Sequence, residues 1–289
     1  MSNYGVFKLC GFADEISPDL GEQIRVCKAL GLTHIELRGV YGKNVLDFDD
    51  ALASEVKSRL KEAGLGVASI GSPVGKVPVD APWEGPGGHR ERFRKAVQLA
   101  RFFDAPFIRL FSYYNPSKGG SVLEHRDEVL WRFRDKVAML EAEAPGVTMV
   151  HENEHAIYGE KGRQCLDLMS SIESPRLRMA FDFANFVQCG ERPLDNWPML
   201  KPYTVHVHVK DAIMGSGKVV PAGEGDGQLE PILLDLARSG YNGFLSLEPH
   251  LAAHGQFSGF SGPELFTRAA EALRSLLARH GLKVATPAS

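Results

Sequence analysis

The sequence predicts an α/β protein that folds as one (β/α)8 TIM barrel over residues 1–289. Short apolar runs alternate with longer helical patterns eight times along the chain, which indicates parallel strands joined by right-handed crossovers. The 289 residues are 44% hydrophobic, and barrels of this kind commonly use about 250 residues as a single domain. An open doubly wound sheet could show the same alternation, but eight repeats in one domain without a Pro/Gly linker favour a closed barrel.

The apolar runs and helical patterns locate the expected elements. Strands are expected at residues 5–12, 33–37, 67–70, 107–111, 147–151, 177–181, 203–209 and 243–247. Helices are expected at residues 19–30, 50–63, 89–103, 122–143, 163–172, 231–239 and 263–279, with a short helical stretch near Asn196. Two long loops, 72–88 and 250–262, follow the third and eighth strands. They could close over the mouth of the barrel as lids, or pack against another subunit.

The charge balance and the cysteines argue against several classes of protein. With 33 basic and 36 acidic side chains the formal net charge is −3, so binding to nucleic acid or a membrane through charge alone is not expected. The cysteines stand far apart without a CxxC pair, which predicts reduced, mostly buried thiols. The sequence shows neither a signal-peptide pattern nor about 18 uninterrupted apolar residues, and we therefore expect a cytoplasmic protein. The four cysteines are Cys10, Cys27, Cys165 and Cys189.

Four side chains of types that can bind a metal ion stand at the ends of the last four strands. They are Glu152, Asp182, His208 and Glu248. Strand ends meet at one rim of a barrel, where three crowded carboxylates would raise one another's pKa unless a cation lay between them. A single acid at a strand end is more often a helix cap or an ion-pair partner, but four equivalent positions favour one divalent metal ion. Oxygen and nitrogen ligands without a thiolate suit Mn²⁺, Mg²⁺, Co²⁺ or Zn²⁺.

These residues belong to motifs that resemble the xylose isomerase-like barrels. This family of sugar phosphate isomerases and epimerases includes ketose 3-epimerases, inosose dehydratases and endonuclease IV. The resemblance runs from residue 11 to residue 249. The motifs that carry it are Gly11-Phe-Ala-Asp-Glu15, His151-Glu-Asn153, Phe181-Asp-Phe-Ala-Asn185, His206-Val-His-Val-Lys-Asp211, Gly223-Glu-Gly-Asp-Gly227 and Leu247-Glu-Pro249.

The resemblance implies that all four strand-end residues bind the metal and that Glu152 and Glu248 are the catalytic acid–base pair. It implies an isomerase or epimerase acting on a sugar, keto-sugar or sugar phosphate, by proton abstraction next to a carbonyl through a metal-stabilised enediolate. A lyase or dehydratase of a keto-sugar or inosose would begin with the same proton abstraction. A phosphodiesterase like endonuclease IV and a non-catalytic sugar-binding barrel are further alternatives. The family is commonly oligomeric, so a homo-oligomer with a small-molecule sugar substrate is expected.

Two positions depart from the pattern of ketose 3-epimerases. Asn185 stands where they usually have a histidine, and Met214 where they usually have an arginine. A simple free-ketohexose epimerase is therefore in doubt. Endonuclease IV is less compatible, because the strand ends at residues 70–72 and 111–112 lack the histidines of its three-metal site.

Several other polar residues near the rim are weaker candidates. His155, Asn185 and Lys210 are predicted substrate contacts; for His155 a solvated loop position is equally consistent, and strand alternation turns Lys210 away unless the strand ends before it. His206 is expected to be a packed interior histidine rather than a partner of the metal site. The Gly223–Gly227 segment is expected to form a turn, and the acids at 14–15 and 36 are expected to form ion pairs across the rim with Arg38.

Overall fold

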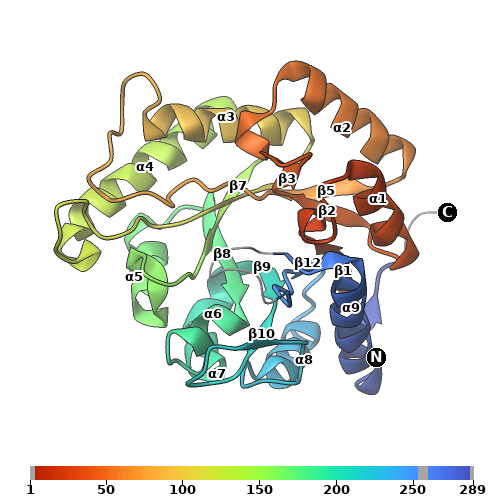
Figure 1. The fold of residues 1–289 in the computed structure, drawn as a ribbon. Coiled ribbons are helices and arrows are strands. Elements are labelled where there is room, and N and C mark those ends of the chain that lie inside the picture. The colour runs from red at the N-terminus through yellow and green to blue at the C-terminus, as the bar shows by residue number, and fades with distance from the viewer. Residues whose placement is uncertain (1–3, 253–259, 287–289) are drawn as a thin grey trace.

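A ring of parallel strands surrounded by helices forms the core of the computed structural model, which describes residues 4–252 and 260–286 (Figure 1). Hydrogen-bonded neighbours run in the order β13-β1-β12-β9-β8-β7-β6-β5-β2. The ring closes between β2 and β1 through a bridge between Phe12 and Glu36. The barrel strands are β1 (Val6–Gly11), β2 (His34–Leu37), β5 (Gly66–Ile70), β6 (Phe107–Leu110), β7 (Thr148–Glu152), β8 (Leu177–Asp182), β9 (Thr204–Val209) and β12 (Phe244–Leu247).

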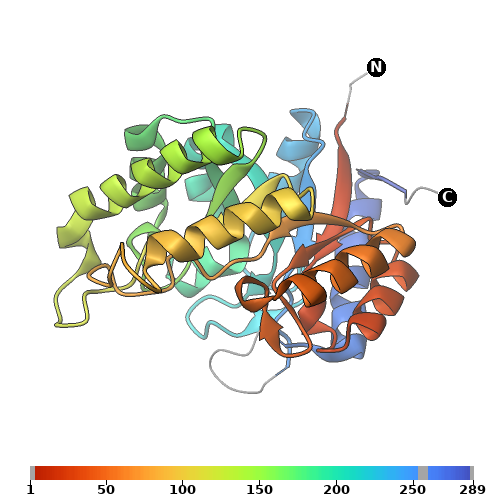
Figure 2. The same cartoon turned by 90° about the horizontal axis from the view of Figure 1, so that it is seen from above.

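The helices between these strands form the outer layer. Figure 1 shows α3 and α4 on one side of the ring and α7 and α8 on the other, and Figure 2 shows α2, α3 and α4 in succession across the outer surface. The helices are α1 (Leu20–Ala29), α2 (Asp50–Glu62), α3 (His89–Phe102), α4 (Arg126–Glu143), α5 (Gly162–Ile172), α6 (Phe183–Gln188), α7 (Pro193–Leu200), α8 (Leu229–Arg238) and α9 (Gly262–Arg279). None among the described residues is long and apolar enough to cross a membrane.

Local sequence signals explain where the first helices begin and end. The Asp19 carboxylate accepts the N–H of Glu22 at the start of α1, and Asp49 accepts that of Leu52 at the start of α2, which satisfies N–H groups that have no partner within the helix. Gly31 and Gly64 follow the two helices with φ of +63° and +71°, a backbone conformation that glycine adopts without steric cost. Both boundaries agree with the sequence analysis.

The interior of the barrel is polar near its carboxyl end and apolar below. A small cluster of Cys10, Ala68 and Phe244, with Phe107 packed against it, closes the lower part of the barrel. Ser246 lies two residues beyond Phe244 and pairs in register with His208, so polar side chains stack above this floor on the same face of the strands. The main hydrophobic core packs the outward faces of the strands against the helices.

Most predicted elements form, and the differences lie where segments are short. The expected helix at 122–143 begins as a 3-10 turn at Val122–His125 before α4, and α6 was not predicted because it follows β8 without a loop. Residues 253–259 of the second predicted lid lie outside the described residues. Four short strands and a strand beside β1 were not predicted: β3 (Gly39–Val40), β4 (Lys43–Asn44), β10 (Asp211–Ala212), β11 (Val219–Val220) and β13 (Lys283–Val284).

Candidate active site

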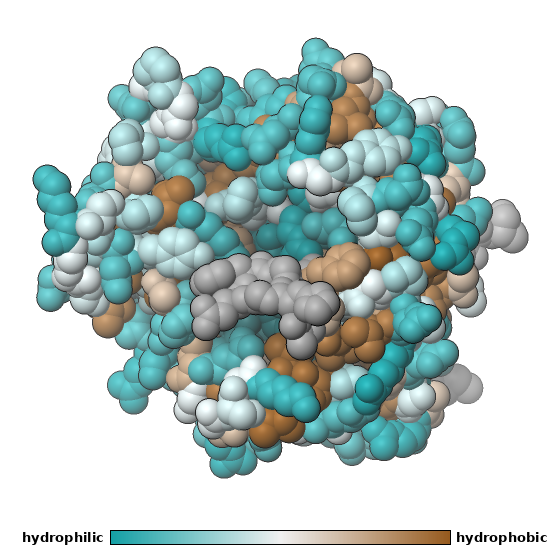
Figure 3. Space-filling model, viewed as in Figure 1, coloured by the Kyte–Doolittle hydropathy of each residue, from teal (hydrophilic) through white to brown (hydrophobic). Residues whose placement is uncertain are grey.

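The four strand-end residues come together at the carboxyl end of the barrel. Glu152 and Asp182 end β7 and β8, His208 is the fifth residue of β9, and Glu248 follows β12. All four are at most 3% exposed, and one potential ligand atom from each lies within 4.8 Å of the others. Nδ1 of His208 lies 3.3 Å from Oε1 of Glu152 and 3.6 Å from Oε2 of Glu248. Figure 3 shows a hollow with hydrophilic residues inside it on this face of the molecule.

Asp182 and Asn185 are fixed by the start of α6. The Asp182 carboxylate accepts the N–H of Asn185 at 2.7 Å and so caps the helix. The Asn185 amide donates to Oε1 of Glu152 at 3.2 Å and to the Asn153 carbonyl at 2.8 Å. Asn153 in turn exchanges two hydrogen bonds with the Asp182 backbone. The predicted substrate contact Asn185 therefore also orients two of the strand-end acids.

Glu36 lies beneath His208 and holds the far side of its ring. Oε2 of Glu36 is 3.2 Å from Nε2 of His208 and 2.9 Å from Nε2 of His206, and it accepts the Ser246 hydroxyl at 2.7 Å. Burial opposes the charge on Glu36, but His208 and His206 outweigh it and lower the pKa of this carboxyl well below its usual value. The Glu36 carboxylate would favour the tautomer of His208 that carries its hydrogen on Nε2, which leaves Nδ1 facing the acidic cluster.

Buried cations lie among these acids. Arg109, an interior residue of β6, donates to Oε2 of Glu152 at 3.2 Å and lies 3.5 Å from Oε1 of Glu248. Nζ of Lys210 lies 3.2 Å from Oδ2 of Asp182 and 3.3 Å from Oε2 of Glu248. Lys210 points inward because β9 ends at residue 209, so the alternation of the strand no longer applies.

The pKa values follow from this arrangement of charges. Burial raises the pKa of Asp182, and Glu152 and Glu248 add to that effect against the opposing charge of Lys210. Burial and the charge of Glu248 also act to raise the pKa of Glu152, but His208 and Arg109 outweigh them and lower it. For Glu248, Lys210 overcomes burial and lowers the pKa well below the usual value. Glu152 and Glu248 are therefore ionised at neutral pH.

The residues present fit a divalent metal ion. Oδ2 of Asp182 and both ring nitrogens of His208 are buried without a hydrogen-bond partner, although Lys210 and Glu36 lie within ion-pair distance of them. Unsatisfied buried ligand atoms are costly in a folded protein unless an ion, water or substrate completes them. Three carboxylates and one imidazole are ligands that suit Mn²⁺, Mg²⁺, Co²⁺ or Zn²⁺.

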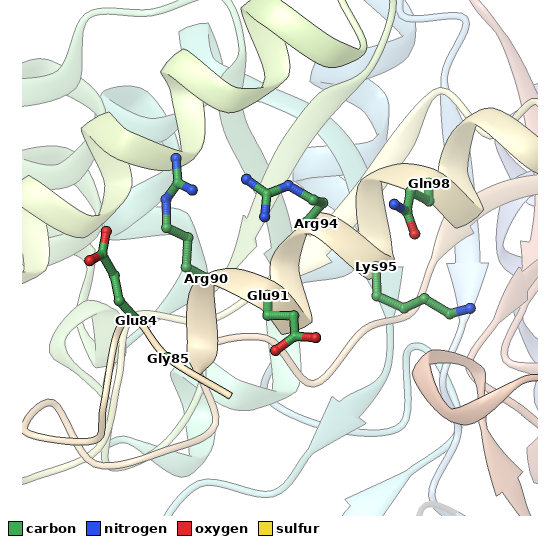
Figure 4. Close-up of a pocket in the computed structure, with 7 residues that line it drawn as sticks. All are labelled: Glu84, Gly85, Arg90, Glu91, Arg94, Lys95 and Gln98. Carbon is green, nitrogen blue, oxygen red and sulfur yellow. The ribbon is translucent and has the colours of Figure 1, made fainter. Parts of the chain in front are cut away.

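Above the cluster a cavity of about 390 Å³ opens at the rim. Arg38 donates to Asp14 at 2.7 Å and to Glu248 at 3.3 Å, so the expected ion pair across the rim forms through Asp14. The residues that line this cavity include Arg38, Lys76, Arg109, Glu154, Glu248 and His250. Two larger cavities lie elsewhere: one of about 570 Å³ includes the amino-end residues Lys8, His34 and Phe107, and one of about 560 Å³ lies along α3 (Figure 4). Neither contains a predicted site residue.

Not every predicted site residue joins the cluster. His155 lies on the rim with 74% of its side chain exposed, next to Glu160 rather than the four strand-end residues. The Gly223–Gly227 segment forms a turn as expected, since Asp211 accepts the N–H groups of Gly223, Gly225 and Gly227. Arg109 was missed, although an arginine inside the apolar run at 107–111 is itself a signal of a buried polar site.

Comparison with known proteins places this barrel in a family. A family model described as Xylose isomerase-like TIM barrel matches residues 24–276. A curated Escherichia coli protein, the uncharacterized YihM, is 31% identical over 101 residues, which cover 33% of this chain and only 29% of YihM.

Solved structures share the fold at low sequence identity. A probable 3-DHS dehydratase, AsbF of Bacillus anthracis, has a TM-score of 0.72 and 19% identity over 93% of this chain and 98% of its own. A D-tagatose 3-epimerase-like protein has a TM-score of 0.73 and 16% identity over 95% and 98% of the chains. A Mycobacterium smegmatis protein in complex with magnesium has a TM-score of 0.61 and 16% identity over 96% and 99%. The neighbours thus include epimerase-like and dehydratase proteins and a magnesium complex. Given the match over most of its length, the chain belongs to the xylose isomerase-like TIM barrel family.

Proposed function

We propose that this protein is a divalent-metal-dependent isomerase or epimerase that moves a proton on the carbon next to a carbonyl of a sugar, keto-sugar or sugar phosphate. The observation that carries the proposal is that two ionised carboxylates, Glu152 and Glu248, both approach His208 Nδ1, at 3.3 and 3.6 Å. Binding a sugar alone would not require two buried bases around one ligand nitrogen.

The metal would be held by Glu152, Asp182, His208 and Glu248. When bound, it would supply a Lewis acid that polarises the carbonyl and a neighbouring hydroxyl of the substrate. The unsatisfied Oδ2 of Asp182 and Nδ1 of His208 favour this assignment over a purely ionic cluster.

Glu152 and Glu248 would act as the acid–base pair. Each is ionised at neutral pH and can accept a proton from a substrate carbon within reach. Their carboxylates come from β7 and from the residue after β12, two strands separated in the ring by β8 and β9. One can therefore remove the proton while the other returns one to the opposite face or the neighbouring carbon. Arg109 touches both acids and would hold them at their positions.

Substrate hydroxyls would be bound by Asn185, Lys210 and His155. Lys210 is 5% exposed and lies between Asp182 and Glu248. A metal ion bound to Asp182 and Glu248 would compete with Lys210 for these carboxylates. The Lys210 ammonium could then donate to a substrate oxygen. His155 lies further out on the rim, where it could reach a larger substrate.

A lyase or dehydratase is the second candidate, and His250 favours it. Nε2 of His250 lies 3.4 Å from Glu248 and 3.2 Å from Glu15. Although burial opposes its charge, Glu15 and Glu248 raise the pKa of His250 to about 9, so it is protonated at neutral pH. A protonated imidazole beside the acid–base pair could donate to a departing hydroxyl.

Hydrogen exchange distinguishes these chemistries. We expect the metal-loaded protein, incubated in D₂O with ketoses and 3-keto-sugars, to place deuterium in at least one of them. A product whose mass equals that of the substrate, apart from the added deuterium, would indicate an isomerase or epimerase. A product that has lost water would indicate a dehydratase. Glu152→Gln and Glu248→Gln should each slow exchange by about 100-fold or more, the usual contribution of a positioned acid or base.

Metal content must be measured with each variant, because both residues are also proposed ligands. Glu143→Gln is the matched control, since Glu143 pairs with Arg94 at 3.3 Å between α4 and α3 in the outer layer, and it should retain most of the rate. Cleavage of a phosphodiester without any exchange across the panel would reject the proposed function in favour of a hydrolase.

A further inference from the structure

A second group of metal-binding side chains lies on the rim of the barrel. Nδ1 of His155 is 3.4 Å from Oε2 of Glu160 and 4.0 Å from Sγ of Cys189, and one potential ligand atom from each lies within 4.8 Å of the others. His155 and Glu160 belong to the segment between β7 and α5, whereas Cys189 directly follows α6. Two segments separated in sequence thus bring together an imidazole, a carboxylate and a thiol.

We propose that His155, Glu160 and Cys189 form a binding site for one thiophilic divalent ion such as Zn²⁺ or Cd²⁺, separate from the strand-end cluster. Tetrahedral zinc with ordinary bond lengths places sulfur and nitrogen ligands about 3.6 Å apart, and nitrogen and oxygen ligands about 3.3 Å apart. The observed separations of 4.0 and 3.4 Å exceed these by about 0.4 and about 0.1 Å. Small side-chain rotations would therefore complete three coordination positions and leave a fourth for water.

Backbone contacts hold two of the three ligands in place. Glu160 accepts the N–H of Ala156 at 2.6 Å, which fixes its carboxylate beside His155. Cys189 caps the carboxyl end of α6, where its N–H donates to the Asn185 carbonyl at 3.1 Å. The His155 side chain is 74% exposed and can rotate toward an arriving ion. Much of the geometry therefore exists before an ion binds.

The surrounding charges also favour a cation. Burial raises the pKa of Cys189 to about 12, and Glu160, Glu154 and Glu191 add to the effect. The thiol is therefore protonated in the ion-free protein, and a bound ion would neutralise the nearby carboxylates and stabilise the thiolate. Of the four cysteines, Cys10, Cys27 and Cys165 are fully buried, which leaves Cys189 as the accessible thiol.

The two sites differ in ligand chemistry and can be loaded separately. The strand-end cluster offers oxygen and nitrogen ligands only, whereas the rim site contains sulfur, and soft ligands favour soft or borderline ions over Mg²⁺. An ion at the rim would tie the segment after β7 to the end of α6. The rim proposal does not depend on the proposed enzymatic activity.

Cadmium titration in the presence of excess Mg²⁺ tests the site. We expect sulfur-to-metal charge-transfer absorption that saturates at one equivalent of Cd²⁺ in the wild-type protein. Cys189→Ser should abolish this absorption, whereas Asp182→Asn should retain it. His155→Ala and Glu160→Gln should each weaken binding by at least about 10-fold. Removing a side chain that only orients a ligand already costs about this much, and a direct ligand should cost no less.

Alkylation of the wild-type protein provides a test without any variant. Because the pKa of Cys189 is raised and the thiolate is the reactive form, the reaction with iodoacetamide is run at about pH 9 until the ion-free protein is modified at Cys189. One equivalent of Zn²⁺ should then protect Cys189, as measured by mass spectrometry, and a chelator should restore modification. Unchanged alkylation with zinc, or charge-transfer absorption that survives in Cys189→Ser, would overturn the proposal.

Discussion

The two halves of the barrel mouth contribute opposite charges to the contacts of the strand-end acids, although Asp14, Glu15 and Glu36 also stand on β2 or after β1. The half formed by β7, β8, β9 and β12 supplies the acids Glu152, Asp182 and Glu248 with His208 between them. The half formed by β1, β2, β5 and β6 supplies Arg109 from within β6 and Arg38 after β2, and both reach Glu248. The acidic half is therefore balanced from across the barrel as well as by its own Lys210.

This difference changes what loss of a metal would mean. From sequence, the three carboxylates were expected to face one another once an ion was removed. In the structure Arg109 lies 3.2 Å from Glu152, and Lys210 lies 3.2 Å from Asp182. The charge of the metal-free cluster is thus partly neutralised. We therefore expect the cations, Arg109 in particular, to contribute strongly to the free energy of unfolding of the metal-free protein.

The largest expected effect follows from removing that cationic partner. Arg109→Met should lower the free energy of unfolding by about 3–5 kcal/mol, the usual cost of leaving a buried charge without its partner. Arg109 has 5% of its side chain exposed, and it also donates to the Gly71 carbonyl. Urea unfolding of the metal-free protein measures the loss.

Arg126→Met is the matched control for this substitution. Arg126 pairs with Asp167 at 2.7 Å on the surface, where an ion pair contributes about 0–1 kcal/mol. Equal losses in the two variants would show that the two halves of the mouth are not electrostatically coupled in the way described.

Metal binding to the acidic half should give the next largest effect. An ion that binds only the native state adds about 2.7 kcal/mol at a concentration 100 times its Kd, so Mn²⁺ should raise the melting temperature and a chelator should lower it. Asp182→Asn should remove most of this response, whereas Asp167→Asn on the surface should keep it. A melting temperature that stays constant while metal content falls to zero would contradict the proposed site.

Glu36 belongs to β2 but acts on the acidic half from below. Glu36→Gln should weaken Mn²⁺ binding by about 10- to 100-fold, because a side chain that orients a ligand histidine typically contributes this much. Isothermal titration calorimetry measures the affinity. Ser246→Ala is the control: it removes a hydrogen bond to Glu36 at 2.7 Å but keeps the charge beside His208, and it should cost less. Similar losses in both variants would mean that the charge of Glu36 is unimportant.

The acidic half could be located from sequence, and the cationic half could not. Glu152, Asp182 and Glu248 each stand where an apolar run ends, so the fold prediction alone brought them to one rim. Arg109 lies inside its apolar run, and only a three-dimensional barrel shows that its long side chain reaches acids on β7 and after β12. Glu36 was expected to form an ion pair across the rim, but it is fully buried between two histidines, because strand alternation turns it into the barrel.

The inward direction of Lys210 and the helix α6 were not predicted, for local reasons. Lys210 points inward because β9 ends one residue before it, and strand ends are the least certain part of any pattern. The helix α6 starts directly after Asp182, so no loop or glycine in the sequence marks the boundary between β8 and this helix. The roles of all these residues in metal binding and catalysis stay predictions.

The smallest expected effect concerns pH and the loop that lines the cationic half. His89 accepts the N–H of Gly75 at 2.7 Å, and this contact requires a neutral ring. Burial, Lys136 and Arg132 lower the pKa of His89 to about 3, whereas an unfolded histidine has a pKa of about 6.5. Between these values the unfolded chain binds more protons than the native one, so stability falls as the pH falls, by up to about 1.4 kcal/mol per pH unit.

Urea unfolding between pH 7 and pH 5 measures this slope before most carboxylates titrate. His89→Gln should reduce it, because the variant has no ring to protonate and its amide oxygen can still accept the Gly75 N–H. Part of the slope should remain, because burial also lowers the pKa of His34 to about 4 and that of His151 to about 3. His280→Gln provides the control, since His280 follows α9 and pairs with Glu230 on the surface, and it should leave the slope nearly unchanged. If His89→Gln keeps the wild-type slope, the acid sensitivity arises in the other histidines whose pKa is lowered, His34 and His151, and the loop after β5 does not depend on a neutral histidine.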